Sequence, residues 1–198
     1  MTATDDPRLR LARPGPGTHR WLFVLAVPLP LAIATASIVM AVLRGSHLAL
    51  AGDSRALTIA MVLGGTLVAG TLLWCVCRWA LGRLSLRVDG GILDVRAAFY
   101  RYRIPLADLD LQRARVVDLD ERPQLRPGLL SNNTMTLPGF RAGWFRLGNR
   151  RFTFVAIVDG RRKLWLPSTG RRDLLIEPRD PAAALERLRE LALPPRRA

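Results

Sequence analysis

Two long apolar runs without a charged side chain, at residues 21–43 and 56–77, constrain this chain more than any other feature. They contain 23 and 22 residues, and only 12 residues separate them. Because an α-helix rises about 1.5 Å per residue, each run is long enough to cross a bilayer core of about 30 Å. We therefore expect a membrane hairpin with transmembrane helices at residues 21–43 and 56–81 and an extracytoplasmic loop at residues 44–55.

The distribution of arginine predicts the side of the membrane on which the hairpin ends lie. Residues 1–20 contain four arginines and residues 78–87 contain three, whereas the loop has one at each end. Positive charge near the span ends favours the cytoplasm, so both termini are expected there, with residues 1–20 as a cytoplasmic N-terminal tail. This topology predicts a multi-pass protein of the inner (plasma) membrane, with Trp21, Trp74 and Trp79 at the cytoplasmic interface.

A cleaved signal peptide is the rival interpretation of the first run. Residues 34–36 resemble a cleavage site because small residues flank a threonine. The apolar run continues to Leu43, however, and a signal sequence does not need this extension. The membrane hairpin is therefore the preferred interpretation.

The composition of both runs favours helix packing over transport. Neither run contains a carboxylate, lysine or arginine, which a pump or ion pathway normally needs at membrane depth. Small residues four positions apart, such as Thr66 and Gly70, allow two helices to approach closely. Pro28 and Pro30 are expected to bend the first helix.

Residues 84–192 are predicted to form one cytoplasmic domain of short strands, followed by a tail at residues 193–198. Apolar and polar residues alternate on both sides of the turn sequence Asp89-Gly90-Gly91, a pattern typical of a hairpin. Residues 121–138 are rich in proline and are expected to form a long loop. The predicted strands lie at residues 84–88, 93–97, 100–104, 109–119 (with a bulge near residues 112–114), 143–147, 151–158, 163–166 and 173–176.

The chain is predicted to end in an amphipathic helix. Asp180 is a suitable N-cap, and Pro181 suits the first helical position. An apolar stripe follows at Ala184, Leu185 and Leu188, which faces a core in such helices.

Four segments of this domain carry a resemblance to a known family: LSLRVDGGILDV, AFYRYRIPLADLD, TLPGFRAGWFRL and DPAAALERLREL. Together they resemble bacterial pleckstrin-homology-like (PH-like) domains that follow a two-span membrane hairpin. The resemblance implies a barrel of about seven antiparallel strands capped by a C-terminal helix, and it implies little about activity. Where phosphoinositide-binding members carry basic residues at the first turn, this chain has Asp89 and Asp94, so inositol phosphate binding is not carried over.

The net charge of +14 raises the possibility of a basic interaction surface. From Arg83 onward there are 23 basic against 13 acidic residues, and all but one of the 30 basic residues are arginine, which also fits a bias in codon usage. The candidate surface for a partner or for lipid consists of Phe140, Arg141, Trp144, Arg146, Arg150, Arg151, Arg161, Arg162 and Lys163.

The residue types of the domain give little support for catalysis. Neither of the two histidines nor either cysteine lies after residue 83, so nucleophilic and zinc chemistry lack their usual groups. Asp108 and Asp110 are interpreted as a solvated strand edge rather than a metal site, and nucleic acid is not expected as a partner. We expect no cofactor and a non-enzymatic scaffold or subunit of a membrane assembly, which binds a partner protein or a second copy. The alternative is recognition of anionic lipid by the basic surface.

Overall fold

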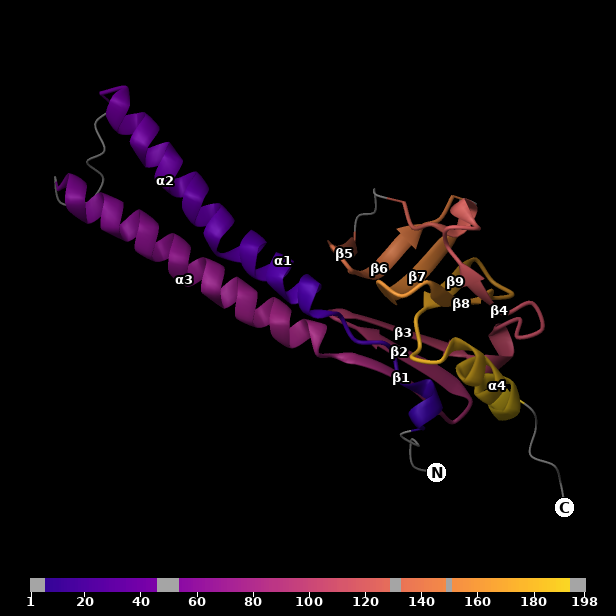
Figure 1. Cartoon of the computed structure of the whole chain (residues 1–198). Coiled ribbons are helices and arrows are strands. Elements are labelled where there is room, and N and C mark those ends of the chain that lie inside the picture. Colours follow the sequence, from indigo (N-terminus) through magenta and orange to yellow (C-terminus); the bar gives the residue numbers. More distant parts are fainter. Residues whose placement is uncertain (1–5, 46–53, 129–132, 149–150, 193–198) are drawn as a thin grey trace, which may run out of the picture. The chain divides into compact units, whose positions relative to one another are not determined.

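The computed structural model describes residues 6–45, 54–128, 133–148 and 151–192 (Figure 1). The chain divides into two compact units. One is Pro16–Trp79, and the other combines Met1–Gly15 with Ala80–Ala198. The first unit is helical and the second contains all the described strands.

Both predicted spans form helices. The first consists of α1 (Pro16–Ala26) and α2 (Pro28–Leu43), and the second is α3 (Arg55–Leu81). The helix is interrupted at Val27, immediately before Pro28, whose backbone nitrogen carries no hydrogen and cannot donate a hydrogen bond. This interruption confirms the predicted bend. With 28 and 27 residues, both helical stretches are long and apolar enough to cross a membrane. Their most apolar windows are only 11% and 6% buried, so most of their surface needs an apolar environment.

Gly70 of α3 lies directly against the backbone at the end of α1. A Cβ atom added there would lie 2.4 Å from the carbonyl oxygen of Ala26, so only glycine fits without a shift of the backbone. The rings of Phe23 and Trp74 pack edge to face at 5.8 Å on the same pair of helices. A Cβ added at Gly64 would meet nothing within 4 Å, so the small-residue spacing is used at Gly70 and not throughout the span.

The second unit begins with a three-stranded antiparallel sheet of β1 (Leu84–Asp89), β2 (Ile92–Ala97) and β3 (Tyr100–Pro105). The first turn has Gly90 and Gly91 at positive φ, as a two-residue hairpin requires. The second turn consists of Ala98 and Phe99, and Ala98 adopts a φ of 53° although it is not glycine. Both hairpins confirm the predicted strands.

A six-stranded sheet follows, with the order β4-β8-β9-β7-β6-β5. Its strands are β4 (Arg115–Asp118), β5 (Asn133–Leu137), β6 (Phe140–Arg146), β7 (Phe152–Val158), β8 (Arg162–Leu166) and β9 (Arg172–Ile176). Strand β9 lies between β8 and β7 and runs parallel to β7. Its residues Leu174, Leu175 and Ile176 are fully buried, because both faces of this central strand are covered.

The sheets differ from the expected PH-like barrel. The described strands form two separate sheets, one of them with a parallel pair, and they do not close into a barrel. The structure confirms a strand-rich domain that ends in a helix, but it does not confirm the PH-like barrel.

Two local predictions in this domain were wrong. The strand expected at residues 109–119 is only β4, because the 3-10 helix η2 (Leu106–Asp108) and a turn occupy the chain before it. The loop expected at residues 121–138 contains the 3-10 helix η3 (Pro123–Leu125) and strand β5.

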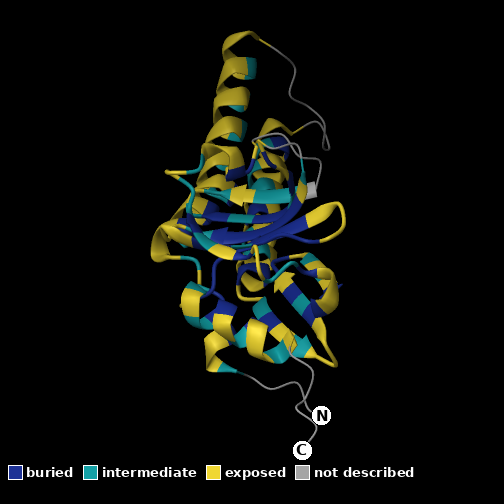
Figure 2. Ribbon diagram, turned by 90° about the vertical axis from the view of Figure 1, so that its right-hand side faces the viewer, coloured by how far each residue is buried: buried dark blue, intermediate teal, exposed yellow. Residues whose placement is uncertain are grey.

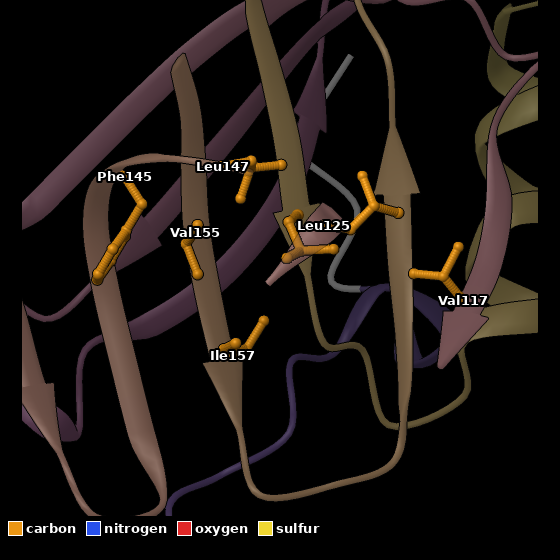
Figure 3. Close-up of a cluster of buried hydrophobic side chains, with 7 residues drawn as sticks. Val117, Leu125, Phe145, Leu147, Val155 and Ile157 are labelled. Atoms are coloured by element: carbon orange, nitrogen blue, oxygen red, sulfur yellow. The ribbon is translucent and has the colours of Figure 1, made fainter. Parts of the chain in front are cut away.

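The two faces of the six-stranded sheet carry different cores. On one face, Leu125 of η3 packs among side chains of the strands (Figure 3). This cluster consists of Val117, Leu125, Phe145, Leu147, Val155, Ile157 and Leu175. On the other face, Tyr102 of β3 contacts Trp144 and Phe154 at ring distances of 4.8 and 5.6 Å. Buried residues (dark blue) accordingly concentrate in the strands, whereas the long helices are largely yellow (Figure 2).

Helix α4 (Pro181–Ala192) closes the domain as predicted. The Asp180 carboxylate accepts hydrogen bonds from the backbone N–H groups of Ala182 and Ala183, at 3.1 Å each. Ala184, Leu185 and Leu188 are buried on the predicted apolar stripe. The helix contacts β8 and β4.

Residues 6–12 form an N-terminal strap on this domain, which the predicted tail did not anticipate. Leu9, in the 3-10 helix η1 (Pro7–Leu9), is buried, and η1 contacts α4. The Ala12 N–H donates to the Glu177 carbonyl at 2.8 Å, and the Arg187 guanidinium binds the Asp6 carboxylate at 2.6 Å. A backbone hydrogen bond from Arg8 and the Arg187 charge hold the pKa of Asp6 below its ordinary value. The strap is therefore an integral part of the second unit.

Candidate functional site

The candidate site is a pocket of about 620 Å³ at one end of the six-stranded sheet. Three segments that are distant in sequence line it: the chain after β4, the β5–β6 hairpin and the β7–β8 turn. The lining residues are Asp118, Leu119, Asp120, Arg126, Pro127, Thr136, Leu137, Pro138, Gly139, Phe140, Arg141, Ile157, Val158, Asp159, Gly160, Arg161 and Lys163. A volume of this size is in the range of binding pockets for small molecules or for side chains of a partner.

The wall after β4 is held by a short polar network. The Asp118 carboxylate accepts the Asp120 N–H at 2.8 Å, which fixes the turn that leaves the strand. The Arg126 guanidinium reaches back to the Asp120 carboxylate at 2.8 Å and to the Leu119 carbonyl at 2.9 Å. These contacts fold the segment around η3 toward the sheet, where Leu125 enters the apolar cluster.

The opposite wall is the tip of the β5–β6 hairpin. Leu137 and Phe140 pair in register, and Pro138 and Gly139 form the two-residue turn, with Gly139 at a φ of 77°. Proline followed by glycine at positive φ is the residue pair of a type II turn. Arg141 crosses the pocket and donates to the Pro127 carbonyl at 3.4 Å, so this hairpin is tied to the segment after β4.

A buried ion pair lies under the third wall. Lys163 and Glu177 are 3% and 5% exposed and form a direct ion pair. The Glu177 carboxylate also accepts the N–H groups of Val158 and Gly160 at 2.8 and 2.9 Å, and the Lys163 ammonium donates to the Val158 carbonyl. Three donors on one carboxylate fix the β7–β8 turn against the end of β9.

The residues predicted as one surface are divided between several environments. Arg141, Arg161 and Lys163 line the pocket, but Lys163 is buried in its ion pair. Phe140 also lines the pocket and is 2% exposed, so it belongs mainly to the core. Arg162 is exposed beside the pocket, and Arg150 lies outside the described residues.

The pocket is lined by the first two residues of β6, Phe140 and Arg141, and the remaining predicted residues of this strand lie farther along it. Successive side chains of a strand point to opposite faces, so Trp144 and Arg146 of β6 face away from Arg141. Trp144 packs against Tyr102 and lies under the guanidinium of Arg172, 5.2 Å from the ring centroid. The sequence interpretation grouped these residues by proximity along the chain and did not separate the two faces.

Arg151 forms an ion pair with a different buried group, the carboxylate of Asp173 on β9. Its guanidinium lies 3.1 Å from the fully buried Asp173 carboxylate and donates to the Gly170 carbonyl at 2.6 Å. The Ser168 N–H also donates to this carboxylate at 3.1 Å. Burial raises the pKa of Asp173, and these two partners oppose that effect. Arg151 is therefore committed to the fold and is not a free surface charge.

The sequence analysis missed several pocket residues but identified the right segments. The proline-rich segment at residues 121–138 and the hairpin TLPGFRAGWFRL both contribute to the pocket. Asp118, Asp120 and Arg126 were not assigned to the candidate surface, because a turn held by an aspartate is not distinctive in sequence. Among the described residues, no three His, Cys, Asp or Glu side chains converge in a way that would hold a metal ion.

Comparison of the chain with protein-family models, with curated proteins and with solved structures found no match.

Proposed function

We propose that this protein is a membrane-anchored, non-enzymatic interaction module, whose pocket receives an extended segment of a partner protein or of a second copy. The observation that carries the proposal is the pocket beside β5, since β5 is the terminal strand of its sheet. An extended segment can pair with a terminal strand through its backbone, while one of its side chains enters an adjacent pocket.

The chemistry of the pocket supports a peptide as its occupant. Leu119, Leu137 and Ile157 offer apolar surface for a side chain. Charged groups of both signs surround that surface, and they include three aspartates (118, 120 and 159) and three arginines (126, 141 and 161). A rim of mixed charge favours a partner with polar and charged groups flanking an apolar residue over a uniformly anionic ligand.

The strap supports a topology in which both ends of the hairpin lie on one side of the membrane. Residues 6–12 precede the first apolar helix and fold with strands that follow the second one. A folded unit cannot straddle a bilayer, so the chain must return to the side from which it started. The arginine distribution supports the cytoplasmic face of a plasma membrane as that side. Of the fold that the resemblance to PH-like domains implies, this proposal keeps only a strand-rich domain closed by a C-terminal helix.

Site-specific photo-cross-linking of the full-length protein in cells tests the proposed function. A photoreactive amino acid at Thr136 or Arg161 samples the pocket, and one at Glu186, exposed on α4, is the control. We expect a discrete protein adduct from the two pocket positions, which is lost when Arg141→Glu is added, and none from position 186. An adduct of twice the chain mass would identify a second copy as the occupant. Absence of a protein adduct at both pocket positions, or equal adducts at position 186, would refute the proposal.

A further inference from the structure

The outer face of the three-stranded sheet is exposed and carries four arginines together with Asp89 and Asp94. Strand alternation places Arg87 of β1, Arg96 of β2, and Arg101 and Arg103 of β3 on this face, and all four are exposed. Asp94 is at the centre of the group. None of these arginines belonged to the surface predicted from the sequence.

One carboxylate holds three of these guanidinium groups side by side. Asp94 Oδ2 lies 3.7 Å from Arg96, 3.2 Å from the Nε of Arg101 and 3.5 Å from the Nε of Arg103. A guanidinium has five N–H donors, so one carboxylate leaves most of these donors directed to solvent. The side chains of the three arginines are 52%, 41% and 60% exposed. The cluster therefore carries a surplus of positive charge in a fixed arrangement that suits phosphate oxygens.

The turn between β2 and β3 adds an apolar group at one end of the same sheet. Phe99 is 53% exposed, and it sits beside Ala98, whose φ of 53° is unfavourable for a residue other than glycine. Residues held in sparsely populated backbone conformations cluster at functional sites, and here such a residue stands next to an exposed aromatic ring. The exposed Phe99 ring has no evident use within the fold of this domain.

Strand register places the turn at Ala98 and Phe99 beside Leu84, the first residue of β1. Leu84 pairs with Ala97, and Ala97 pairs with Tyr100 across the turn. Leu84 follows the last residue of α3, Leu81, by only three positions, so chain length keeps it within about 11 Å of the helix end. The headgroup layer on each side of a bilayer is about 5–8 Å thick. The Phe99 turn is thus at the end of the sheet that the chain tethers near the membrane.

We propose that the β1–β3 sheet is a membrane seat: Phe99 enters the headgroup layer, and the cluster of Arg96, Arg101 and Arg103 binds phosphates of anionic lipids. This inference rests on the membrane anchoring in the proposed function and is independent of the pocket. It places lipid contact on a different face from the one predicted from the sequence. Each arginine that reaches an anionic surface contributes about fivefold to the equilibrium between the seated and free positions of the sheet.

Environment-sensitive labels on the full-length protein in lipid nanodiscs test the seat. In a background of Cys75→Ser and Cys77→Ser, a fluorophore is attached to Phe99→Cys or to Ile92→Cys, and quenching by brominated lipid is measured. Ile92 is a matched control, because it is 44% exposed at the opposite end of β2, about 17 Å away. We expect quenching at position 99 in phosphatidylglycerol nanodiscs, reduced by high salt, and little quenching at position 92.

Charge variants and a label in the first span separate the seat from the anchor. Arg101→Gln with Arg103→Gln should lower the ratio of quenched to unquenched label at position 99 about 25-fold. The same change at Arg171 and Arg179, which are exposed before and after β9 and do not line the pocket, should have no effect. A label at Ile33→Cys, on α2, reports membrane insertion alone. Quenching at position 33 with none at position 99 would refute the seat and retain the anchor, whereas no quenching at either position would refute both.

Discussion

Replacing Lys163 by methionine should destabilise the domain by about 3 kcal/mol, because it leaves a buried carboxylate without its cation. Breaking a buried ion pair by removing one partner costs about 3–5 kcal/mol. Glu177 keeps two backbone N–H donors, at 2.8 and 2.9 Å, so we expect a value at the lower end of this range. The carbonyl of Val158 also loses its lysine donor. For a domain of this size, the loss corresponds to a fall in Tm of about 10 °C.

Urea unfolding of the full-length protein in detergent micelles, followed by pulse proteolysis, measures this loss in the domain. The matched control is Arg126→Met, which breaks the ion pair of Arg126 with Asp120 on the same pocket. Those side chains are 53% and 81% exposed, so the control should cost less than about 1 kcal/mol. Adding Glu177→Gln to Lys163→Met should recover part of the loss, since no unpaired charge then remains in the core.

The outcome for the double variant decides whether charge is the cause. If Lys163→Met and Arg126→Met lost the same stability, the Lys163 pair would not be buried as described. If the losses of stability caused by Lys163→Met and by Glu177→Gln simply added in the double variant, lost packing rather than an uncompensated carboxylate would explain the destabilisation.

Two further predictions concern the hairpin and the pH dependence of stability. In a background of Cys75→Ser and Cys77→Ser, Gly70→Ala should lower the yield of a disulfide between cysteines introduced at Phe23 and Trp74, because the added Cβ meets the Ala26 carbonyl oxygen at 2.4 Å. Gly64→Ala should leave the yield unchanged. Burial raises the pKa of Asp173 above 3.8, so the folded chain holds this proton more tightly than the unfolded chain does. The free energy of unfolding should therefore fall as pH rises from 3.8 through the raised pKa, and Asp173→Asn should flatten this part of the profile, as urea titrations at several pH values would show. An unchanged profile in Asp173→Asn, or equal disulfide yields in the two glycine variants, would contradict these arguments.

Local patterns were sufficient to predict the elements that depend on neighbouring residues. The apolar runs predicted the helices, Pro28 predicted the break, and Asp180 with Pro181 predicted the start of α4. Alternation predicted β1, β2, β3 and most of β6 to β9. In each case the signal lies within about ten residues of the element that it specifies.

Pairing between distant segments could not be predicted in the same way. The short turn between β7 and β8 favours a hairpin, yet β9 pairs with both strands and separates them. The uninterrupted apolar sequence at residues 174–176 is compatible with this central position, because such a strand is buried on both faces. The expected barrel assumed neighbours in sequence to be neighbours in the sheet.

The candidate site shows the same limit. Lys163 was grouped with surface arginines, although it is the single lysine among 30 basic residues. In a chain that otherwise uses arginine, one retained lysine is a signal of a position where a slender ammonium is needed, and here it is buried against Glu177. The alternation of Leu9 and Leu11 with arginines was likewise a readable sign that the predicted tail would pack.

The N-terminal strap gives the biogenesis of this protein an unusual order. Asp6 is synthesised before both apolar helices, whereas its partner Arg187 is synthesised 181 positions later. At about 5–20 residues per second, Asp6 waits roughly 10–40 s for its partner while both helices and the described strands are synthesised. The strap thus joins the domain only after both helices and the strands have been made, and in the proposed topology it can do so only once the chain has returned to its starting side of the membrane.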